Sequence, residues 1–232
     1  MMKVFITGGT GFVGTYLSRR LVQEGHQVTI LTRRSRPPAP TAPGISYVVG
    51  DPTQEGPWMG AVAEHDWIIN LAGASIFTRW SAGHKQEIFD SRVRTTRNLV
   101  IALAQGDRRQ LFCSTSAVGY YGPRGEETLT EESPADAGFL GDVSKAWEAE
   151  ALKAQELGVR TVITRFGIVL GKGGGRSGIT AGMNTLRPSV STNGRPFSGD
   201  QLLSLRSNWR SYQTSSSSES KRFLSFMRKP GR

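Results

Sequence analysis

The sequence predicts an α/β fold: a Rossmann-like, doubly wound parallel sheet with helices on both faces. Two observations favour it. Short apolar runs alternate with segments of helical periodicity between residues 2 and 170. A glycine-rich turn follows the first apolar run and opens a helix. Strands that alternate with helices form a parallel sheet, because each return crossover needs a helix to cover one face.

The elements are predicted in chain order from these patterns. Apolar and β-branched residues dominate six segments, as is usual for strands buried on both faces. These predicted strands are KVFITGG (3–9), QVTILTR (27–33), ISYVVGD (45–51), DWIINLAG (66–73), RQLFCSTS (109–116) and VRTVITRFGIVLG (159–171). A first helix is expected over 16–25. A second, over 84–105, places Ile88, Val93, Leu99 and Leu103 near one face. A third, over 147–158, contains strong helix formers and ends at Gly158.

Composition sets the limits of the fold. The chain has 232 residues and is 37% hydrophobic, which suffices for one large domain with a packed core. Its single cysteine, Cys113, lies in an apolar run and is expected to be a buried bystander. No apolar run has the roughly 20 residues of a membrane span, and a strand begins too early for a signal peptide. These patterns predict a cytoplasmic protein that is not embedded in a membrane.

The charge distribution divides the chain in two. The net charge is +10, but residues 176–232 hold ten of the 29 basic residues and only two of the 19 acidic ones. This segment is rich in serine and loses all hydrophobic periodicity, which predicts a basic, disordered tail after a domain at residues 1–175. A basic tail with few aromatic residues disfavours nucleic-acid binding as the main function.

The glycine-rich turn is the strongest functional signal. In TGGTGFVG (7–14), Gly8 permits a tight turn, Gly11 lets the backbone approach a diphosphate, and Gly14 lets helix and strand pack closely. The helix N-terminus then offers free N–H groups to phosphate. The predicted contacts of a nicotinamide dinucleotide in this turn are Gly8, Thr10, Gly11, Phe12, Val13 and Gly14.

The ends of the next strands predict which cofactor binds. Enzymes that use NAD place a carboxylate after the second strand, whereas this chain has Arg33 and Arg34 there, which can pair with a 2′-phosphate. NADP is therefore favoured over NAD, although the arginines would also suit a solvated loop. Asp51 would accept a hydrogen bond from adenine or form a turn. The small residues after Asn70 would run beside the cofactor: Leu71, Ala72 and Gly73.

These motifs resemble the extended short-chain dehydrogenase/reductase superfamily, and in particular its atypical subgroup called "epimerase family protein", whose members include SulA-like proteins. The matching stretches cover about residues 2–175. They are TGGTGFVG, NLAGASI, SRVRTT (91–96), STSAVGYYG (114–122), LTEESP (129–134), FLGDVSKAWE (139–148) and RFGIVLGKGGG (165–175). The resemblance implies an NADP-binding domain, a smaller C-terminal substrate domain, and kinship with nucleotide-sugar epimerases.

The resemblance also implies a catalytic Ser–Tyr–Lys set, which this chain matches only in part. Ser116 matches the hydroxyl that orients the substrate, or satisfies local backbone. Lys145 matches the lysine if the register is right; in the alternative register, set by Glu148, Ser144 takes its place. The tyrosine position falls on Gly141 or Leu140, so the usual base is missing, and Tyr121 is the nearest remaining candidate together with Tyr120. No metal site is predicted.

The C-terminal segment departs from the family at about Arg176. The substrate domain is therefore expected to be absent or disrupted, through a shifted reading frame or through genuine divergence; translation of the other frames would distinguish the two.

Two functions remain open at this stage. One is an NADP-dependent epimerase or oxidoreductase whose substrate is a small molecule such as a nucleotide sugar. The other is an inactive NADP-binding regulatory or cell-division-associated interaction protein. By analogy with extended relatives, a homodimer would form through residues 83–105 and the helix near 145–157.

Overall fold

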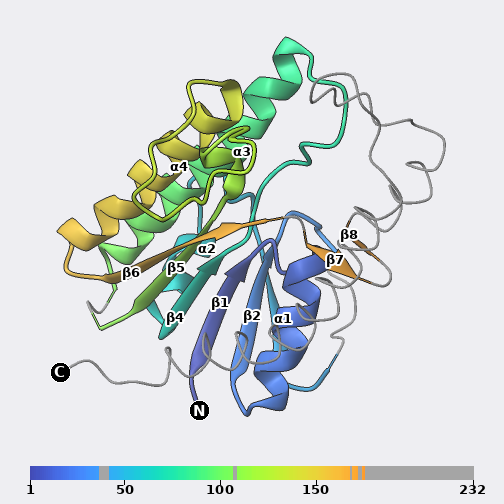
Figure 1. The fold of residues 1–232 in the computed structure, drawn as a ribbon. Helices are drawn as coiled ribbons and strands as arrows, with labels where there is room; N and C mark the ends of the chain where they lie inside the picture. Colours follow the sequence, from blue (N-terminus) through green and yellow to red (C-terminus); the bar gives the residue numbers. More distant parts are fainter. Residues whose placement is uncertain (37–41, 107–108, 168, 172–173, 176–232) are drawn as a thin grey trace. The chain divides into compact units, whose positions relative to one another are not determined.

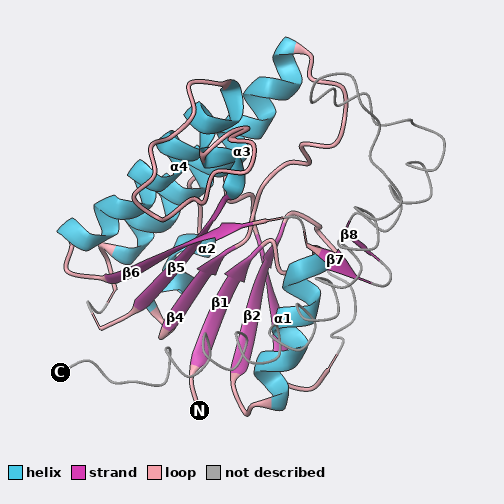
Figure 2. Ribbon diagram, in the orientation of Figure 1, coloured by secondary structure: helices cyan, strands magenta, loops and turns pink. Residues whose placement is uncertain are grey.

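A computed structural model describes residues 1–36, 42–106, 109–167, 169–171 and 174–175. Its centre is a parallel six-stranded sheet in the order β3-β2-β1-β4-β5-β6 (Figures 1 and 2). The strands are β1 (Lys3–Thr7), β2 (Gln27–Thr32), β3 (Ile45–Val49), β4 (Trp67–Asn70), β5 (Leu111–Ala117) and β6 (Arg160–Phe166). This order confirms the doubly wound α/β fold that the sequence predicts. The predicted tail, residues 176–232, lies outside the described residues.

Four α-helices accompany the sheet in the described part of the chain. They are α1 (Phe12–Gln23), α2 (Trp58–Ala63), α3 (Ala82–Leu103) and α4 (Phe139–Glu156). The short 3-10 helix η1 (Val118–Tyr120) follows β5, and β7 (Leu170–Gly171) pairs with β8 (Gly174–Gly175) in a separate two-stranded ribbon. None of the described helices is both long enough and apolar enough to cross a membrane.

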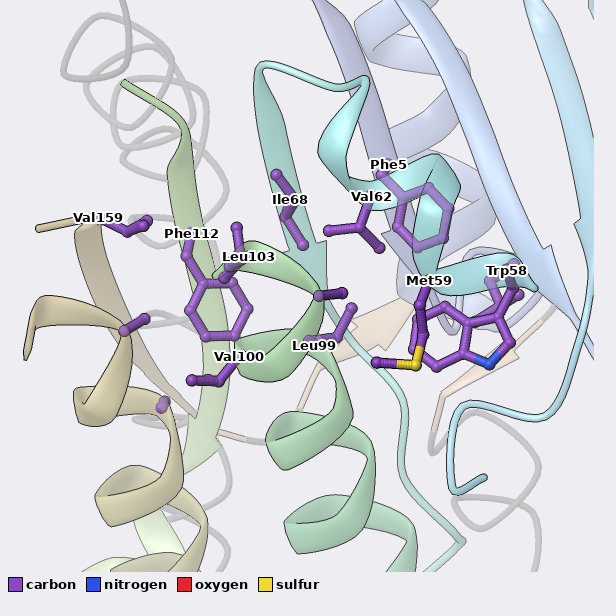
Figure 3. Close-up of a cluster of buried hydrophobic side chains, with 14 residues drawn as sticks. Phe5, Trp58, Met59, Val62, Ile68, Leu99, Val100, Leu103, Phe112 and Val159 are labelled. Atoms are coloured by element: carbon purple, nitrogen blue, oxygen red, sulfur yellow. The ribbon is translucent and has the colours of Figure 1, made fainter. Parts of the chain in front are cut away.

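The main core lies on the sheet face that α2, α3 and α4 cover. Figure 3 shows Phe5, Ile68 and Phe112 of the strands packed among Trp58 of α2 and Leu99 of α3. Alternate strand residues point to the opposite face, so Val4 and Ile6, both fully buried, belong to the side on which α1 packs. The two apolar faces explain why the strands read as continuous apolar runs rather than as an alternating pattern.

Cys113 lies in the middle of β5, in register with Ile69 of β4 and Val162 of β6. Its side chain is 3% exposed, and burial raises the pKa of the thiol to about 11, partly offset by a hydrogen bond with Thr164. The thiol is therefore protonated at neutral pH, as the bystander interpretation predicts.

The boundaries of the elements differ from the prediction, and three differences stand out. Helix α1 begins at Phe12, directly after the glycine turn, and α4 begins at Phe139, well before its run of strong helix formers. Strand β6 ends at Phe166, whereas the apolar pattern continues to Gly171. The short helix α2, of six residues, was not predicted, because it is too short to show helical periodicity.

One glycine explains how the N-terminal turn of α4 packs. A Cβ atom at Gly141 would overlap the backbone carbonyl of Asp136, which leaves no room for any side chain unless the backbone shifts. In the glycine of α2, Gly60, the same atom would meet nothing within 4 Å. Gly141 is one of the two positions, with Leu140, on which the missing tyrosine would fall, and the local backbone leaves no room for a tyrosine at Gly141.

Gly141→Ala is therefore expected to destabilise the protein by about 1–3 kcal/mol, because overpacking forces the backbone apart. The control Gly60→Ala is expected to be neutral or to stabilise by up to about 1 kcal/mol, since alanine is the better helix former. Urea unfolding followed by circular dichroism measures both values. Equal stability of the two variants would contradict the steric argument.

His65, at the end of α2, joins two layers of the fold. Its Nδ1 donates to the carbonyl of Ala61 (2.6 Å), so its Nε2 accepts from Thr29 Oγ1 (2.8 Å), and its ring packs edge-on against Phe5. Burial lowers the pKa of His65 below 6.5, although the hydrogen bond to Ala61 partly opposes this. The native state therefore prefers the neutral ring.

Stability should consequently decrease as the pH falls below about 6.5, because the unfolded chain then takes up a proton that the native state resists. Above that pH the contribution of His65 is fully present. Urea unfolding at pH 7.5 and pH 5.0 should show a larger loss for the wild type than for His65→Gln. The control is His84, which is less buried than His65: His84→Gln should keep the wild-type loss, and an equal loss in all three proteins would disprove the assignment.

Candidate functional site

A cleft of about 800 Å³ opens at the carboxyl ends of the strands, where open α/β sheets bind their ligands. Its volume lies in the usual range for small-molecule sites. The lining includes nine of the twelve predicted cofactor contacts: Gly8, Thr10, Gly11, Arg33, Arg34, Asp51, Leu71, Ala72 and Gly73. The other three, Phe12, Val13 and Gly14, form the first turn of α1. Their contact with a cofactor stays a prediction.

The glycine turn forms the floor of the cleft. Gly8 has φ +69°, a conformation that favours glycine, and a Cβ atom there would lie 2.6 Å from the carbonyl oxygen of Leu71. The Gly11 N–H donates to the carbonyl of Gly8 (3.0 Å), which closes the turn at the start of α1. The first N–H groups of a helix have no intrahelical acceptor, so this turn presents donors to an anion.

The end of β2 carries cations and no carboxylate. Arg33 and Arg34 are exposed and line the cleft, and the Arg34 N–H donates to Thr32 Oγ1 (3.2 Å). Arg36 is also exposed, yet it does not belong to the lining. The end of β2 thus brings two guanidinium groups to the cleft, and their contact with a ribose or its phosphate stays a prediction.

Asp51 lies in the cleft wall after β3, but its carboxylate also has a local role. Its Oδ1 accepts from the backbone N–H of Thr53 (2.9 Å) and from Thr53 Oγ1 (2.8 Å). This is the turn that the sequence offered as the alternative. Among the described residues, no hydrogen bond to the other oxygen, Oδ2, is found. A contact of Asp51 with adenine stays a prediction.

Asn70 ties the strand ends together beneath the cleft. It is fully buried; its Oδ1 accepts from Thr7 Oγ1 (2.7 Å) and its Nδ2 donates to Thr96 Oγ1 (2.9 Å). Its backbone carbonyl accepts from Thr115 Oγ1 (2.8 Å). Asn70 therefore joins β4 to β1, β5 and α3 through its side-chain amide and its backbone carbonyl.

One face of α3 forms the cleft wall that sequence reasoning missed. Its residues are His84, Glu87, Asp90, Ser91, Arg94 and Thr95. Several of these residues recur at helical spacing. Three of them belong to the SRVRTT stretch (91–96), and this motif was the one signal in the sequence that could have indicated the wall. His84 Nδ1 lies 2.9 Å from a carboxylate oxygen of Glu87, and Arg94 forms an ion pair with Asp90 (3.2 Å).

Two of the three predicted catalytic residues, Ser116 and Tyr121, contact the same ion pair, outside the residues that line the cleft. Ser116 Oγ donates to Glu148 Oε1 (2.5 Å), and Glu148 forms a two-pronged ion pair with Arg165 (2.8 and 2.7 Å). Arg165 also donates to Tyr121 OH (2.6 Å), and its guanidinium lies 3.7 Å from the ring centroid of Tyr120. The hydrogen bonds to Glu148 raise the pKa of Arg165, so the guanidinium stays protonated.

Lys145 does not join this cluster. Its side chain is exposed on α4 and forms an ion pair with Asp142 (2.8 Å). Ser144, its alternative in the other register, is buried. The catalytic roles of Ser116, Tyr121 and Lys145 therefore stay predictions, and the geometry gives each of them a structural partner. Glu148 and Arg165 had no sequence signal for this pairing, because they are distant along the chain.

Among the described residues, no cluster of His, Cys, Asp or Glu suits a metal ion.

Comparison with known proteins places these features in a family. The model of the NAD dependent epimerase/dehydratase family matches residues 4–191, which extends beyond the predicted junction at Arg176. The chain is 38% identical over 182 residues to the chloroplastic epimerase family protein SDR39U1 homolog of Arabidopsis thaliana, covering 75% of this chain and 51% of that protein. It is also 38% identical to the epimerase family protein YfhF of Bacillus subtilis, covering 75% and 57%.

Solved structures that resemble this chain include proteins described as epimerases. The human epimerase family protein SDR39U1, isoform 2, crystallised with NADPH, is 31% identical with a TM-score of 0.62, over 78% of this chain and 59% of that one. A nucleoside-diphosphate sugar epimerase from Corynebacterium glutamicum is 31% identical with a TM-score of 0.66, over 85% and 39%. The chain spans little more than half the length of the curated relatives that it matches. By the sequence match and the sheet order together, the chain belongs to the NAD dependent epimerase/dehydratase family.

Proposed function

We propose that this chain binds NADP(H) in the cleft and forms the cofactor-binding part of an oxidoreductase or epimerase that acts on a nucleotide sugar. The observation that carries the proposal is the pairing, in one cleft, of a glycine turn at a helix N-terminus with Arg33 and Arg34 at the end of β2. The turn suits a diphosphate, and the arginines suit a 2′-phosphate.

The residues present fit this cofactor. The close approach of Gly8 to Leu71 leaves the floor of the cleft as bare backbone, and its donors face the space that a diphosphate would occupy. When bound, a nicotinamide cofactor accepts or supplies a hydride. The human relative crystallised with NADPH supports the same preference, and the relative from Corynebacterium glutamicum supports a nucleotide sugar as the substrate class.

The preference for NADP(H) is tested by calorimetric titration of the full chain with NADPH and with NADH. Arg33→Ala and Arg34→Ala are each expected to weaken NADPH binding about tenfold or more, because each removes a charged partner of the 2′-phosphate. Binding of NADH, which lacks this phosphate, should hardly change. The control Arg36→Ala, outside the cleft lining, should bind both as the wild type does. Unchanged NADPH affinity in the double variant of Arg33 and Arg34 would refute the proposal.

A second function, cofactor binding without turnover, is supported by the arrangement of the catalytic candidates. Ser116 and Tyr121 both contact the Glu148–Arg165 pair, and Lys145 lies apart from them. No tyrosine can stand at Gly141 without a backbone shift. These contacts support a protein in which the standard proton transfer between a tyrosine and a lysine does not occur, and which acts as a regulatory or interaction protein that retains its cofactor.

Ser116→Ala separates these two functions. Since Ser116 is absent from the cleft lining, the variant should keep its NADPH affinity within about twofold while losing about 1 kcal/mol of stability with its hydrogen bond. If the second function holds, incubation with NADP(H) and a set of nucleotide sugars, followed by nicotinamide fluorescence, shows no turnover with either protein. Turnover by the wild type that Ser116→Ala abolishes would instead establish the enzyme and give Ser116 a direct role.

A further inference from the structure

Ala74, in the cleft wall after β4, has both of its backbone polar groups held by consecutive residues of α3. Its N–H donates to Ser91 Oγ (2.9 Å), and its carbonyl accepts from Arg92 Nη2 (3.1 Å). Each holding side chain is itself fixed: Ser91 Oγ donates to the carbonyl of Ile88 (3.2 Å), and Arg92 Nη1 donates to the same carbonyl (3.1 Å). We call the side chains of Ser91 and Arg92 the Ala74 clamp.

The clamp requires a glycine next to Ala74. A Cβ atom at Gly73 would lie 3.0 Å from Arg92 Cζ and 3.1 Å from its Nη2, so the guanidinium lies directly against bare backbone. The guanidinium also lies over the ring of Trp147 of α4, with its Cζ 5.4 Å from the ring centroid. Arg92 is thus enclosed by α3, α4 and the cleft wall, which leaves its side chain one well-defined position.

The charge of Arg92 is not compensated by a carboxylate among the described residues. Other arginines of α3 do have such partners: Arg94 pairs with Asp90 and Arg97 with Glu150. Burial alone lowers the pKa of Arg92 to about 10, so the guanidinium remains protonated at neutral pH. Gly73, Ala74 and Ser91 line the cleft, so this positive charge lies directly behind its wall. In a partly buried site such a charge attracts an anionic ligand.

We propose that Arg92 is a positioning residue for ligand binding: it fixes the Gly73–Ala74 wall and supplies a positive charge behind it for a phosphorylated dinucleotide. The inference rests on the proposed function, because it assumes that the cleft binds NADP(H). It goes beyond the glycine turn and the arginines after β2, since it assigns ligand affinity to a side chain that does not itself line the cleft.

The test compares Arg92→Met and Arg92→Lys with the wild type in the full chain. Methionine keeps the length of the side chain but removes its charge and donors, whereas lysine keeps the charge but cannot bond both carbonyls as a guanidinium does. The matched control is Arg97→Met, on the same helix, because Arg97 faces Glu150 and Glu150 retains Lys153 as a partner. Two quantities are measured: the amide hydrogen exchange of residues 71–75 and the Kd for NADPH.

Arg92→Met is expected to accelerate exchange in residues 71–75 and to weaken NADPH binding about tenfold, with Arg92→Lys between it and the wild type. Arg97→Met should change neither quantity. A purely structural role would lower the thermal stability of Arg92→Met but leave the NADPH affinity of its folded fraction unchanged, and that result would overturn the proposal. If Arg92→Met does not fold, the amide exchange of residues 71–75 and the Kd for NADPH in Arg92→Lys decide whether the proposal holds.

The exchange measurement also separates this inference from the proposed function. If the wild type binds neither NADPH nor NADH, the proposed function fails, and with it the ligand part of the inference. Exchange in residues 71–75 still shows whether Arg92 fixes the wall. If exchange there is the same in all variants, the clamp itself is wrong, whatever the protein binds.

Discussion

The site depends first on one buried amide. Asn70 bonds Thr7, Thr96 and Thr115, and so fixes where three neighbouring strands end relative to α3. A cleft at the carboxyl edge of a parallel sheet is only as well defined as those strand ends. Asn70 is fully buried, so the loss of any one of these hydrogen bonds would leave a polar group unpaired in the core and destabilise the fold. The bonds therefore favour one arrangement of the strands over arrangements shifted in register.

A second polar cluster surrounds the ion pair of Glu148 and Arg165. It joins β5, β6 and α4 through Ser116, Glu148 and Arg165, of which Ser116 alone is a predicted catalytic residue. An ion pair of this burial contributes less to net stability than to specifying one geometry, because desolvation offsets much of the attraction. Arg165 also bonds the carbonyl of Glu131, so the segment after η1 is held to the sheet edge. The chain thus combines a cleft that is open to ligand with an adjoining region whose polar groups bond one another.

Most of the fold and the floor of the cleft could be predicted from the sequence, because both depend on the order of residues within short segments. Apolar runs marked all six strands of the sheet, and glycine spacing marked the turn at Gly8 and Gly11. The helical wall of the cleft was missed, since the face of α3 that meets it mixes charged and small polar residues without an apolar signal. The partners of Ser116 were missed for another reason: Glu148 and Arg165 come together only through the pairing of β5 with β6 and the return of α4. Contacts of that kind arise from tertiary structure, and no spacing in one sequence reveals them.

The lone thiol of the chain has a practical value. Cys113 lies between two paired strands and is protonated at neutral pH, so an alkylating reagent reacts with it only when β5 becomes accessible and the sulfur can ionise. Since no other cysteine competes, the rate of alkylation in the unmodified protein reports the frequency with which the centre of the sheet opens. The molecule therefore carries its own probe of conformational opening, at a buried residue in the middle of β5.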